Sequence, residues 1–231
     1  MVNIADERFS PAITRYDSPL GRMLTVIECP HTQLRYLILD CPTESTLGFY
    51  LDEFMHLSVK TVVRCCQPTY QAQRLAEQGI QVLDLPFKDG GLPPPQVIQE
   101  WLQLVETTRE KQRKLDEQQQ LQQGDDDKTL HQKSQPTIAV HCVAGLGRAP
   151  VLVAIALIEM GMKPLDAIEY IRSKRRGAFN KPQIVFLDSY KRILKPKSSG
   201  SNYSLRSSLG RMFKLGSSSS SSNSKTTSDQ H

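Results

Sequence analysis

The 231-residue sequence predicts an α/β domain, with a mostly parallel central sheet of four or five strands flanked by helices. Short apolar runs alternate with segments of helical periodicity, and a cluster of helical segments follows the last run. Apolar residues make up 39% of the chain and charged residues 23%, as in ordinary globular proteins. We therefore expect residues 1–194 to form one folded domain.

The expected strands are short, rich in β-branched residues and bounded by proline, glycine or polar residues. They are 23–28, 34–40, 60–66, 80–85 and 136–142, and the first two are expected to pair. Between and after them, apolar residues recur at helical intervals. The expected helices are 45–59, 69–79, 92–118, 148–161, 164–177 and 181–194. The helix at 148–161 is apolar on nearly all sides and should be buried.

Two segments have too little apolar surface to pack and are expected to be disordered. The first is a Gln- and Asp-rich insertion at about 117–135, which follows the long helix. The second is the Ser-rich tail 195–231. Eight Lys or Arg residues lie from Lys191 onward against one acidic residue, Asp229, so the tail carries the basic charge. This distribution argues against a nucleic-acid-binding fold and is compatible with contact between the tail and acidic surfaces or acidic lipids. A merely solvated tail is the alternative, and it is the more common case.

Cysteine usage and the absence of an apolar leader point to the cytoplasm. The five cysteines fit neither a zinc pattern nor a disulfide scaffold, which favours a reducing compartment. The first ten residues are charged where a signal peptide is apolar, and the longest apolar run, 151–158, is too short to span a bilayer. We expect a soluble protein without a metal or a cofactor.

The segment HCVAGLGRAP, residues 141–150, places a cysteine and an arginine on one turn between a strand and a buried helix. Such a turn directs backbone N–H groups and the positive end of the helix at one point, which is an anion site. Gly145 and Gly147 allow the backbone to curl. The phosphate-binding amides are expected to come from Val143, Ala144, Gly145, Leu146, Gly147 and Arg148.

In this positive field Cys142 should be a thiolate and the nucleophile, since the pKa of such a thiol falls to roughly 3.5–7.5. Arg148 offers two parallel donors to a phosphate and should clamp it in the transition state. His141 is expected to orient the loop and to support the thiolate. The bland alternative, a core thiol beside a surface arginine, is weaker because arginine in a first helical turn opposes the helix dipole.

The segment 140–183 closely resembles the phosphatase of regenerating liver family, the type IVA protein tyrosine phosphatases, and a looser resemblance extends over 13–194. It implies a dual-specificity-like cysteine phosphatase fold, with Cys142 as nucleophile and Arg148 as phosphate clamp. It also implies Asp89 as the general acid, in the segment DLPFKDGG, where Asp84 is the alternative carboxylate and is expected to be structural. The family usually has tryptophan at Leu85 and aspartate at Lys88, so this loop departs from its pattern.

Cys65 and Cys66 are adjacent on an expected strand, so at most one can face Cys142. The resemblance implies that Cys66 is the redox partner, able to form a disulfide that silences the nucleophile; two ordinary buried thiols are the alternative. Most cysteine phosphatases have Ser or Thr at the position of Ala149. The family that this chain resembles has alanine there too, which predicts a long-lived phosphocysteine and slow turnover.

The sequence thus predicts a phosphatase acting on phosphotyrosine proteins, and leaves two alternatives. The first is a module that mainly binds partners, which the resemblance implies are CNNM-type magnesium transporters. The second is a phosphoinositide phosphatase, disfavoured by the uncharged loop residues Val143, Ala144 and Leu146. The family usually ends in a prenylation box, but Cys142 is the last cysteine here, so we expect no prenylation and any membrane contact to depend on the basic tail.

Overall fold

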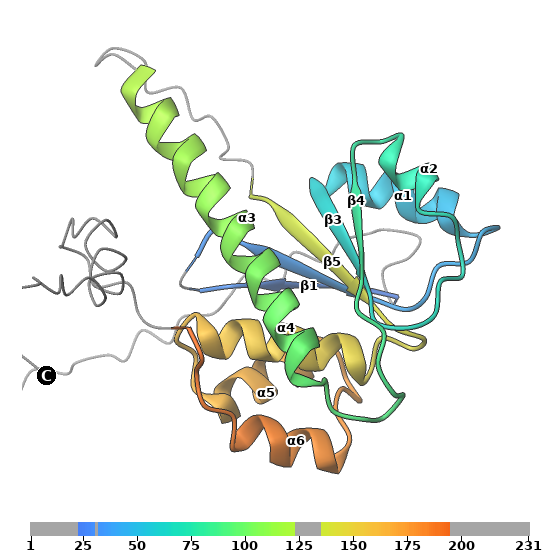
Figure 1. Cartoon of the computed structure of the whole chain (residues 1–231), viewed down its shortest axis with the longest axis vertical. Coiled ribbons are helices and arrows are strands. Elements are labelled where there is room, and N and C mark those ends of the chain that lie inside the picture. Colours follow the sequence, from blue (N-terminus) through green and yellow to red (C-terminus); the bar gives the residue numbers. More distant parts are fainter. Residues whose placement is uncertain (1–22, 31, 123–134, 195–231) are drawn as a thin grey trace, which may run out of the picture. The chain divides into compact units, whose positions relative to one another are not determined.

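A computed structural model describes residues 23–30, 32–122 and 135–194 of the protein (Figure 1). Five strands form one sheet in the order β1-β2-β5-β3-β4. Only β1 is antiparallel to its neighbour, so the expectation of a mostly parallel sheet and of pairing between the first two strands is confirmed. The strands are β1 (Leu24–Glu28), β2 (Arg35–Leu39), β3 (Val59–Arg64), β4 (Gln81–Asp84) and β5 (Thr137–His141).

Helices cover both faces of this sheet (Figure 1). On one face lie α1 (Leu47–His56) and α2 (Gln73–Ala76), over a core that includes Leu39, Val62 and Ala139. The other face carries α3 (Pro95–Gln122), α4 (Arg148–Glu159), α5 (Pro164–Lys174) and α6 (Lys181–Asp188). Every residue of α4 is buried, as its apolar sequence predicts. The parallel strands therefore end at one edge of the sheet, where α4 begins.

Every helix differs from the sequence prediction at one end or both, and α1, α2 and α6 are shortened most. α2 covers only Gln73–Ala76 of the expected 69–79, because Arg64 Nη1 binds the Tyr70 carbonyl (2.8 Å) and holds the preceding segment outside the helix. α6 stops at Asp188 instead of continuing to 194. The Glu159 carboxylate accepts hydrogen bonds from the backbone N–H groups of Ile193 (2.7 Å) and Leu194 (3.0 Å), which draws that segment away.

α3 is longer than predicted and continues to Gln122. Residues 117–122, which the sequence assigns to the disordered insertion, are therefore helical. Side-chain pairs one turn apart support this exposed end, among them Arg113–Glu117 (3.3 Å) and Gln112–Asp116 (3.0 Å). Residues 123–134 of the expected insertion, and the tail 195–231, lie outside the described residues.

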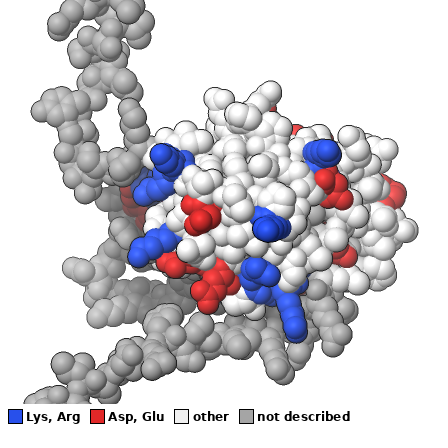
Figure 2. Space-filling model, turned by 90° about the horizontal axis from the view of Figure 1, so that it is seen from below, with Lys and Arg blue, Asp and Glu red and all other residues white. Residues whose placement is uncertain are grey.

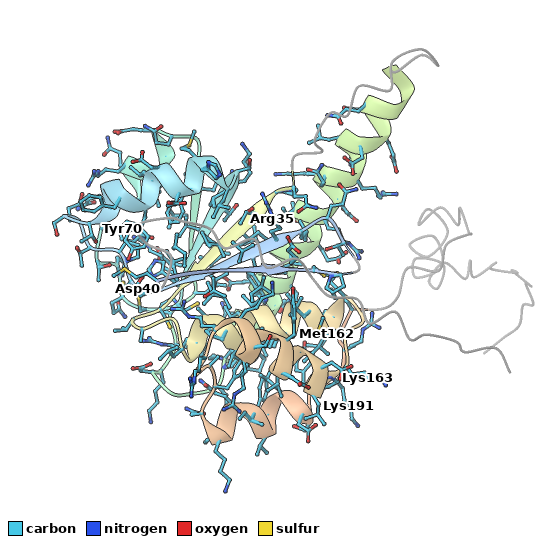
Figure 3. The ribbon with its side chains drawn as sticks, turned by 180° about the vertical axis from the view of Figure 1, so that it is seen from behind. Arg35, Asp40, Tyr70, Met162, Lys163 and Lys191 are labelled. Atoms are coloured by element: carbon cyan, nitrogen blue, oxygen red, sulfur yellow. The ribbon has the colours of Figure 1, made fainter. Side chains whose placement is uncertain are left out.

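The described surface carries mixed charge on the face that Figure 2 shows, where acidic and basic side chains lie side by side. Long-range hydrogen bonds tie the far end of the sheet together: Arg35, which begins β2, donates to the carbonyls of Leu57 and Gln135 (both 3.0 Å). Asp40 follows the opposite end of β2 (Figure 3). That second end is the one that carries the functional loop.

Candidate active site

The loop Val143–Gly147 connects the end of β5 to the start of α4, and its carbonyl groups all point outward to other partners. Donors outside the loop bind four of them: the Cys41 N–H binds the Val143 carbonyl (2.9 Å), the Phe179 N–H the Leu146 carbonyl (2.8 Å), and Arg175 the Ala144 and Gly145 carbonyls. Within the described part of the chain, no protein acceptor takes the amides of residues 143–148. The loop is therefore a nest of unpaired N–H groups at a helix N-terminus, and the binding of phosphate there stays a prediction.

Gly145 is the residue on which this curl depends. Its φ of +64° lies in the left-handed region, and an added Cβ would lie 2.6 Å from the Leu39 carbonyl oxygen and 2.4 Å from Arg175. Gly147 has an ordinary φ of −119°, and a Cβ there would lie 3.3 Å from the Gln183 side chain. Only Gly145 thus has a conformation that demands glycine.

Arg175 is a supporting residue of the loop that the sequence analysis did not single out. Its Nε donates to the Gly145 carbonyl (2.6 Å) and its Nη2 to the Ala144 carbonyl (3.1 Å). Nη1 binds the Met23 carbonyl (3.1 Å) and the Thr25 hydroxyl (3.0 Å). Burial lowers the pKa of its guanidinium. By taking both loop carbonyls, Arg175 holds the amides of the same loop on the opposite side.

Cys142 lies at the base of the nest, 2% exposed, in the same core cluster as Cys65. Burial and, after it, the neighbouring Cys142 raise the pKa of the Cys65 thiol well above its ordinary value. Cys65 is therefore held as a neutral thiol in the core, whereas Cys142 is the cysteine that the loop surrounds.

Arg148 begins α4 and its guanidinium is buried beside the loop. Nη1 donates to the carbonyls of Cys65 and Phe87 (both 3.1 Å), and Nη2 lies 3.1 Å from Asp89 Oδ1. Nε is buried and has no hydrogen-bond partner among the described residues. A buried N–H without an acceptor costs roughly 1–3 kcal/mol, so this atom marks a place where an anion would be stabilised.

The two candidate acids have different surroundings. The Asp84 carboxylate pairs bidentately with Arg64 (2.5 and 2.7 Å) at the end of β4, which fits the structural role expected for it. The Asp89 side chain is 78% exposed and contacts Arg148 across the loop. Asp89 is therefore the carboxylate that the fold brings to the guanidinium.

The start of α6 holds the two glycines that follow Asp89. Asn180 Nδ2 donates to the Gly90 carbonyl (2.9 Å) and Gln183 Nε2 to the Gly91 carbonyl (3.1 Å). The same two side chains form the capping box of α6, whose signal is the sequence NKPQ. The capping box thus fixes both the helix and the loop that carries Asp89.

His141 is 1% exposed and donates or accepts at both ring nitrogens. Nε2 lies 2.9 Å from the Tyr70 hydroxyl and Nδ1 lies 3.4 Å from the Cys142 carbonyl oxygen. Burial lowers the pKa of this imidazole to about 4, so it is neutral at neutral pH. A neutral imidazole with a polar contact at each ring nitrogen can orient the loop but cannot supply a positive charge to the thiolate.

Cys66 lies with Cys41 (Sγ–Sγ 3.6 Å) and 4.0 Å from His141 Nδ1, and no hydrogen bond joins it to Cys142 among the described residues. Burial raises the pKa of its thiol to about 12. Both Cys65 and Cys66 follow β3 instead of lying in it. The expected Cys66–Cys142 disulfide stays a prediction.

Comparison with known proteins identifies this arrangement. Residues 53–190 match the model of the protein-tyrosine phosphatase family. The chain is 46% identical over 157 residues to a probable protein tyrosine phosphatase type IVA A of Dictyostelium discoideum, covering 68% of this chain and 82% of that protein. It is 42% identical over 165 residues to the mouse protein tyrosine phosphatase type IVA 2, covering 71% and 86%. The chain belongs to the type IVA protein tyrosine phosphatases.

A solved structure agrees with the fold. A putative protein tyrosine phosphatase from Leishmania major is 41% identical, with a TM-score of 0.61, and the match covers 73% of this chain and 99% of that one. The resemblance predicted from the segment 140–183 is thereby confirmed, together with the fold class and the phosphatase activity. No helix of the described residues is long and apolar enough to span a membrane.

Proposed function

We propose that this phosphatase hydrolyses phosphotyrosine proteins through a phosphocysteine on Cys142. The observation that carries the proposal is the loop itself, with six amides that have no acceptor among the described residues and the unpartnered Nε of Arg148 beside them. A phosphoryl group has three terminal oxygens and carries a charge near −2, which such a ring of donors stabilises.

In the first step Cys142 Sγ attacks phosphorus and the bond from phosphorus to the phenolic oxygen breaks. The departing oxygen takes a proton, and Asp89 is the donor that the fold offers. A positioned acid of this kind contributes about 10²- to 10⁴-fold. When phosphate binds, Arg148 Nη2 turns from Asp89 to a phosphate oxygen, and the carboxyl group stays above the leaving oxygen to supply that proton.

In the second step water attacks phosphorus and the sulfur leaves as thiolate, with Asp89 taking a proton from the water. Ala149 is fully buried beside the loop and has no hydroxyl to assist the departing sulfur. Hydrolysis of the phosphocysteine is therefore the slow step that we propose.

The rim of the loop favours an aromatic substrate. Val143 is 59% exposed and Leu146 39% exposed, so apolar side chains surround the entrance. They suit a phenyl ring, whereas a phosphoinositide head group would need basic side chains at these positions. Phosphotyrosine is therefore the substrate class that we assign.

The decisive experiment is to trap the intermediate. Wild-type protein is mixed with a phosphotyrosine peptide, quenched in acid and analysed by mass spectrometry. We expect one added phosphoryl group on Cys142, a burst of one product per site and a slow steady state. Cys142→Ser should show neither the phosphoryl group nor the burst. Cys29→Ser replaces a buried thiol directly after β1 and should behave as wild type. Fast linear turnover without a burst would refute the proposal.

Slow turnover also supports a second candidate role, the binding of CNNM-type magnesium transporters. A long-lived phosphocysteine would fill the loop and compete with any partner that inserts an acidic side chain there. The proposal predicts that Cys142→Ser captures such a transporter better than wild type incubated with a phosphotyrosine substrate. Equal capture by both forms would separate binding from the loop.

Two further expectations rest on the same site and on the tail. Hydrogen peroxide should join Cys66 and Cys142 in a disulfide, the two thiols losing their hydrogens as peroxide becomes two waters; the Cys66 side chain must first turn from Cys41, which it contacts in this structure (Sγ–Sγ 3.6 Å). Peptide mapping under non-reducing conditions distinguishes this pair from a pair with Cys65. We also propose that the protein is cytoplasmic and contacts membranes through its basic tail. It should then sediment with anionic vesicles, and removal of residues 195–231 should abolish that sedimentation.

A further inference from the structure

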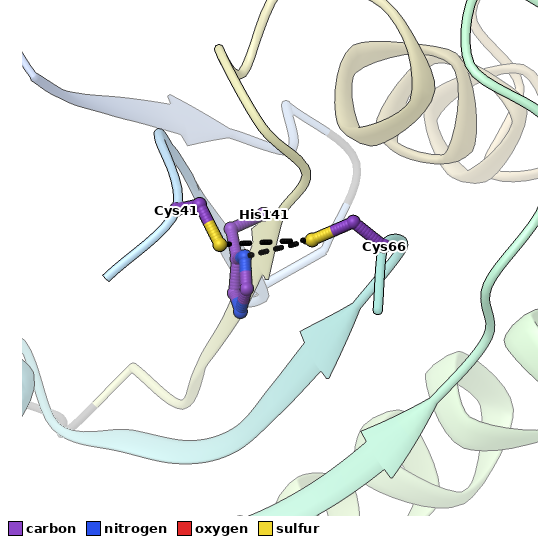
Figure 4. A group of neighbouring side chains, drawn as sticks. All are labelled: Cys41, Cys66 and His141. Atoms are coloured by element: carbon purple, nitrogen blue, oxygen red, sulfur yellow. Dashed lines mark hydrogen bonds between the residues drawn. The ribbon is translucent and has the colours of Figure 1, made fainter. Parts of the chain in front are cut away.

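A cluster of two thiols and an imidazole lies behind the catalytic loop, and the phosphatase chemistry does not use it. Cys41 comes two residues after β2 ends, Cys66 two residues after β3 ends, and His141 is the last residue of β5 (Figure 4). Leu39, His141 and Arg64 are in register across these three neighbouring strands. Because side chains alternate along a strand, Cys41, Cys66 and His141 share one face. Cys142 directly follows His141, so its side chain points to the opposite face of the sheet.

The three ligand atoms lie at distances that suit coordination. Cys41 Sγ and Cys66 Sγ are 3.6 Å apart, Cys66 Sγ and His141 Nδ1 are 4.0 Å apart, and all three lie within 4.8 Å of one another. We propose that Cys41, Cys66 and His141 bind a divalent transition metal ion of the zinc type.

The geometry matches what zinc requires. Bonds of about 2.3 Å to sulfur and about 2.0–2.1 Å to nitrogen, at tetrahedral angles, separate two sulfurs by roughly 3.8 Å and sulfur from nitrogen by roughly 3.5 Å. The observed separations of 3.6 and 4.0 Å need shifts of only a few tenths of an ångström. Cys41 is half-buried, so the ion can enter from its side, and the fourth position is left for water.

The imidazole is held as a metal ligand needs to be. Its Nε2 lies 2.9 Å from the Tyr70 hydroxyl, and in the metal-bound form an Nε2–H would donate to that oxygen. Nδ1 would then give up its 3.4 Å contact with the Cys142 carbonyl oxygen and present its lone pair to the two thiols. A bond on the other ring nitrogen of this kind fixes the tautomer and the ring orientation of metal-bound histidines. Tyr70 also contacts Arg64, which lies over its ring at 5.0 Å, so the tyrosine itself is anchored.

Charge balance favours the same conclusion. Coordination would displace one proton from each thiol to solvent, and two thiolates would neutralise the ion beside a neutral histidine. No net charge is then left in a buried place. Thiolate and imidazole ligands favour zinc and related ions over magnesium or calcium, which bind oxygen. With three protein ligands, the site should exchange its ion more readily than a closed four-ligand structural site.

An occupied site would join the ends of β2, β3 and β5 immediately behind the nucleophile. The Cys41 N–H already binds the Val143 carbonyl of the loop (2.9 Å), and His141 is covalently next to Cys142. The ion would also engage Cys66, the thiol that the redox prediction assigns to Cys142. Zinc should therefore slow formation of that disulfide.

The test uses the full chain, freed of metal by a chelator and kept reduced by a phosphine. Zinc is titrated and counted by elemental analysis after gel filtration, and cobalt replaces it to give the charge-transfer absorption of a thiolate-bound ion. We expect one ion per chain for wild type and for Cys29→Ser, the matched control that also loses a buried thiol. Cys41→Ser should lose the ion and the absorption, and Tyr70→Phe should bind about 10- to 100-fold more weakly.

Cys142→Ser distinguishes the proposed site from the nucleophile. It should still bind one ion, because Cys142 is not a ligand. The proposal is overturned if reduced wild type binds no zinc, if Cys142→Ser loses the ion while Cys41→Ser keeps it, or if Cys29→Ser loses it. Thermal unfolding of each variant without metal verifies that it folds. Phosphatase turnover is measured separately, in protein freed of metal by the chelator. Metal binding is therefore judged independently of whether the protein shows phosphatase activity.

Discussion

Replacing Arg175 by lysine tests whether outward-facing carbonyls set the phosphate-binding amides. The lysine keeps the charge but has one nitrogen where arginine has three. Arg175 makes four hydrogen bonds from one buried fork, two of them to the loop carbonyls of Ala144 and Gly145. The shorter, single-headed side chain cannot reach both loop carbonyls and the β1 acceptors together.

The expected loss follows from the number of bonds. A hydrogen bond from a charged donor contributes about 1.5–3 kcal/mol, so losing the two to the loop costs about 3 kcal/mol at the lower end of that range. The lower end applies because the loop can relax. In a domain of this size about 1 kcal/mol shifts the melting temperature by about 2–4 °C, which gives a fall of roughly 6–12 °C.

Two measurements are needed, because a merely structural role would change only one of them. Thermal unfolding measures the stability of the fold. The value of kcat/KM for a phosphotyrosine peptide at 25 °C reports whether the loop amides still stabilise the transition state. We expect kcat/KM to fall about 10²-fold, as when one transition-state donor is misplaced. The matched control is Arg176→Lys at the exposed neighbouring position, which should change stability by less than about 0.5 kcal/mol. A melting fall with unchanged kcat/KM, or equal effects at both positions, would refute the reasoning.

Asp89→Asn should lower kcat by about 10²- to 10⁴-fold with little change in stability, because its side chain is 78% exposed, and kinetics with a phenolic substrate measures this. Asp84→Asn should do the reverse and destabilise the fold by roughly 1–2 kcal/mol in urea unfolding, less than a fully buried pair because its carboxylate is 46% exposed; equal kinetic losses in both would remove the distinction. Gly145→Ala should destabilise by at least about 2 kcal/mol in urea unfolding, whereas Gly48→Ala, in α1 with open space, should stabilise by about 0.5–1 kcal/mol; equal signs would contradict the strain argument. Ala149→Ser should raise the steady-state rate about tenfold and shorten the burst, because one hydrogen bond of about 1.4 kcal/mol to the departing sulfur corresponds to a tenfold rate. An unchanged rate would show that the missing hydroxyl does not limit hydrolysis of the phosphocysteine.

The sequence predicted all five strands and the buried helix α4, because their apolar patterns are local and strong. The lengths of α2 and α6 could not be predicted, since they depend on distant side chains. Arg64 holds the Tyr70 carbonyl outside α2, and Glu159 captures the backbone N–H groups of Ile193 and Leu194 beyond α6. The longer α3 is a different case: the pair Arg113–Glu117 stands in the sequence at helical spacing and was a usable signal.

The site was predictable where its chemistry lies on one turn. Cys142, Arg148 and the loop amides are all within eight residues, so the spacing alone indicated them. Arg175 stands in the sequence beside Arg172, Lys174 and Arg176, at the end of an expected helix, although the structure buries it at 7% exposure under the loop. Nothing local separates it from its neighbours, because its acceptors lie 30 residues upstream in the loop and in β1.

Four cysteines near this end of the sheet show why strand register decides function here. Adjacent Cys65 and Cys66 must point to opposite faces, but the sequence cannot say which face holds the nucleophile. The pairing of Arg64 with His141 decides it: Cys65 joins the core of Cys142, and Cys66 joins Cys41 and His141. The phosphate site and the proposed metal site thus lie on opposite faces of one strand end, separated by the single peptide between His141 and Cys142. Metal binding at Nδ1 of His141 would remove the contact of Nδ1 with the Cys142 carbonyl oxygen (3.4 Å), which links the proposed metal site to the backbone of the nucleophile.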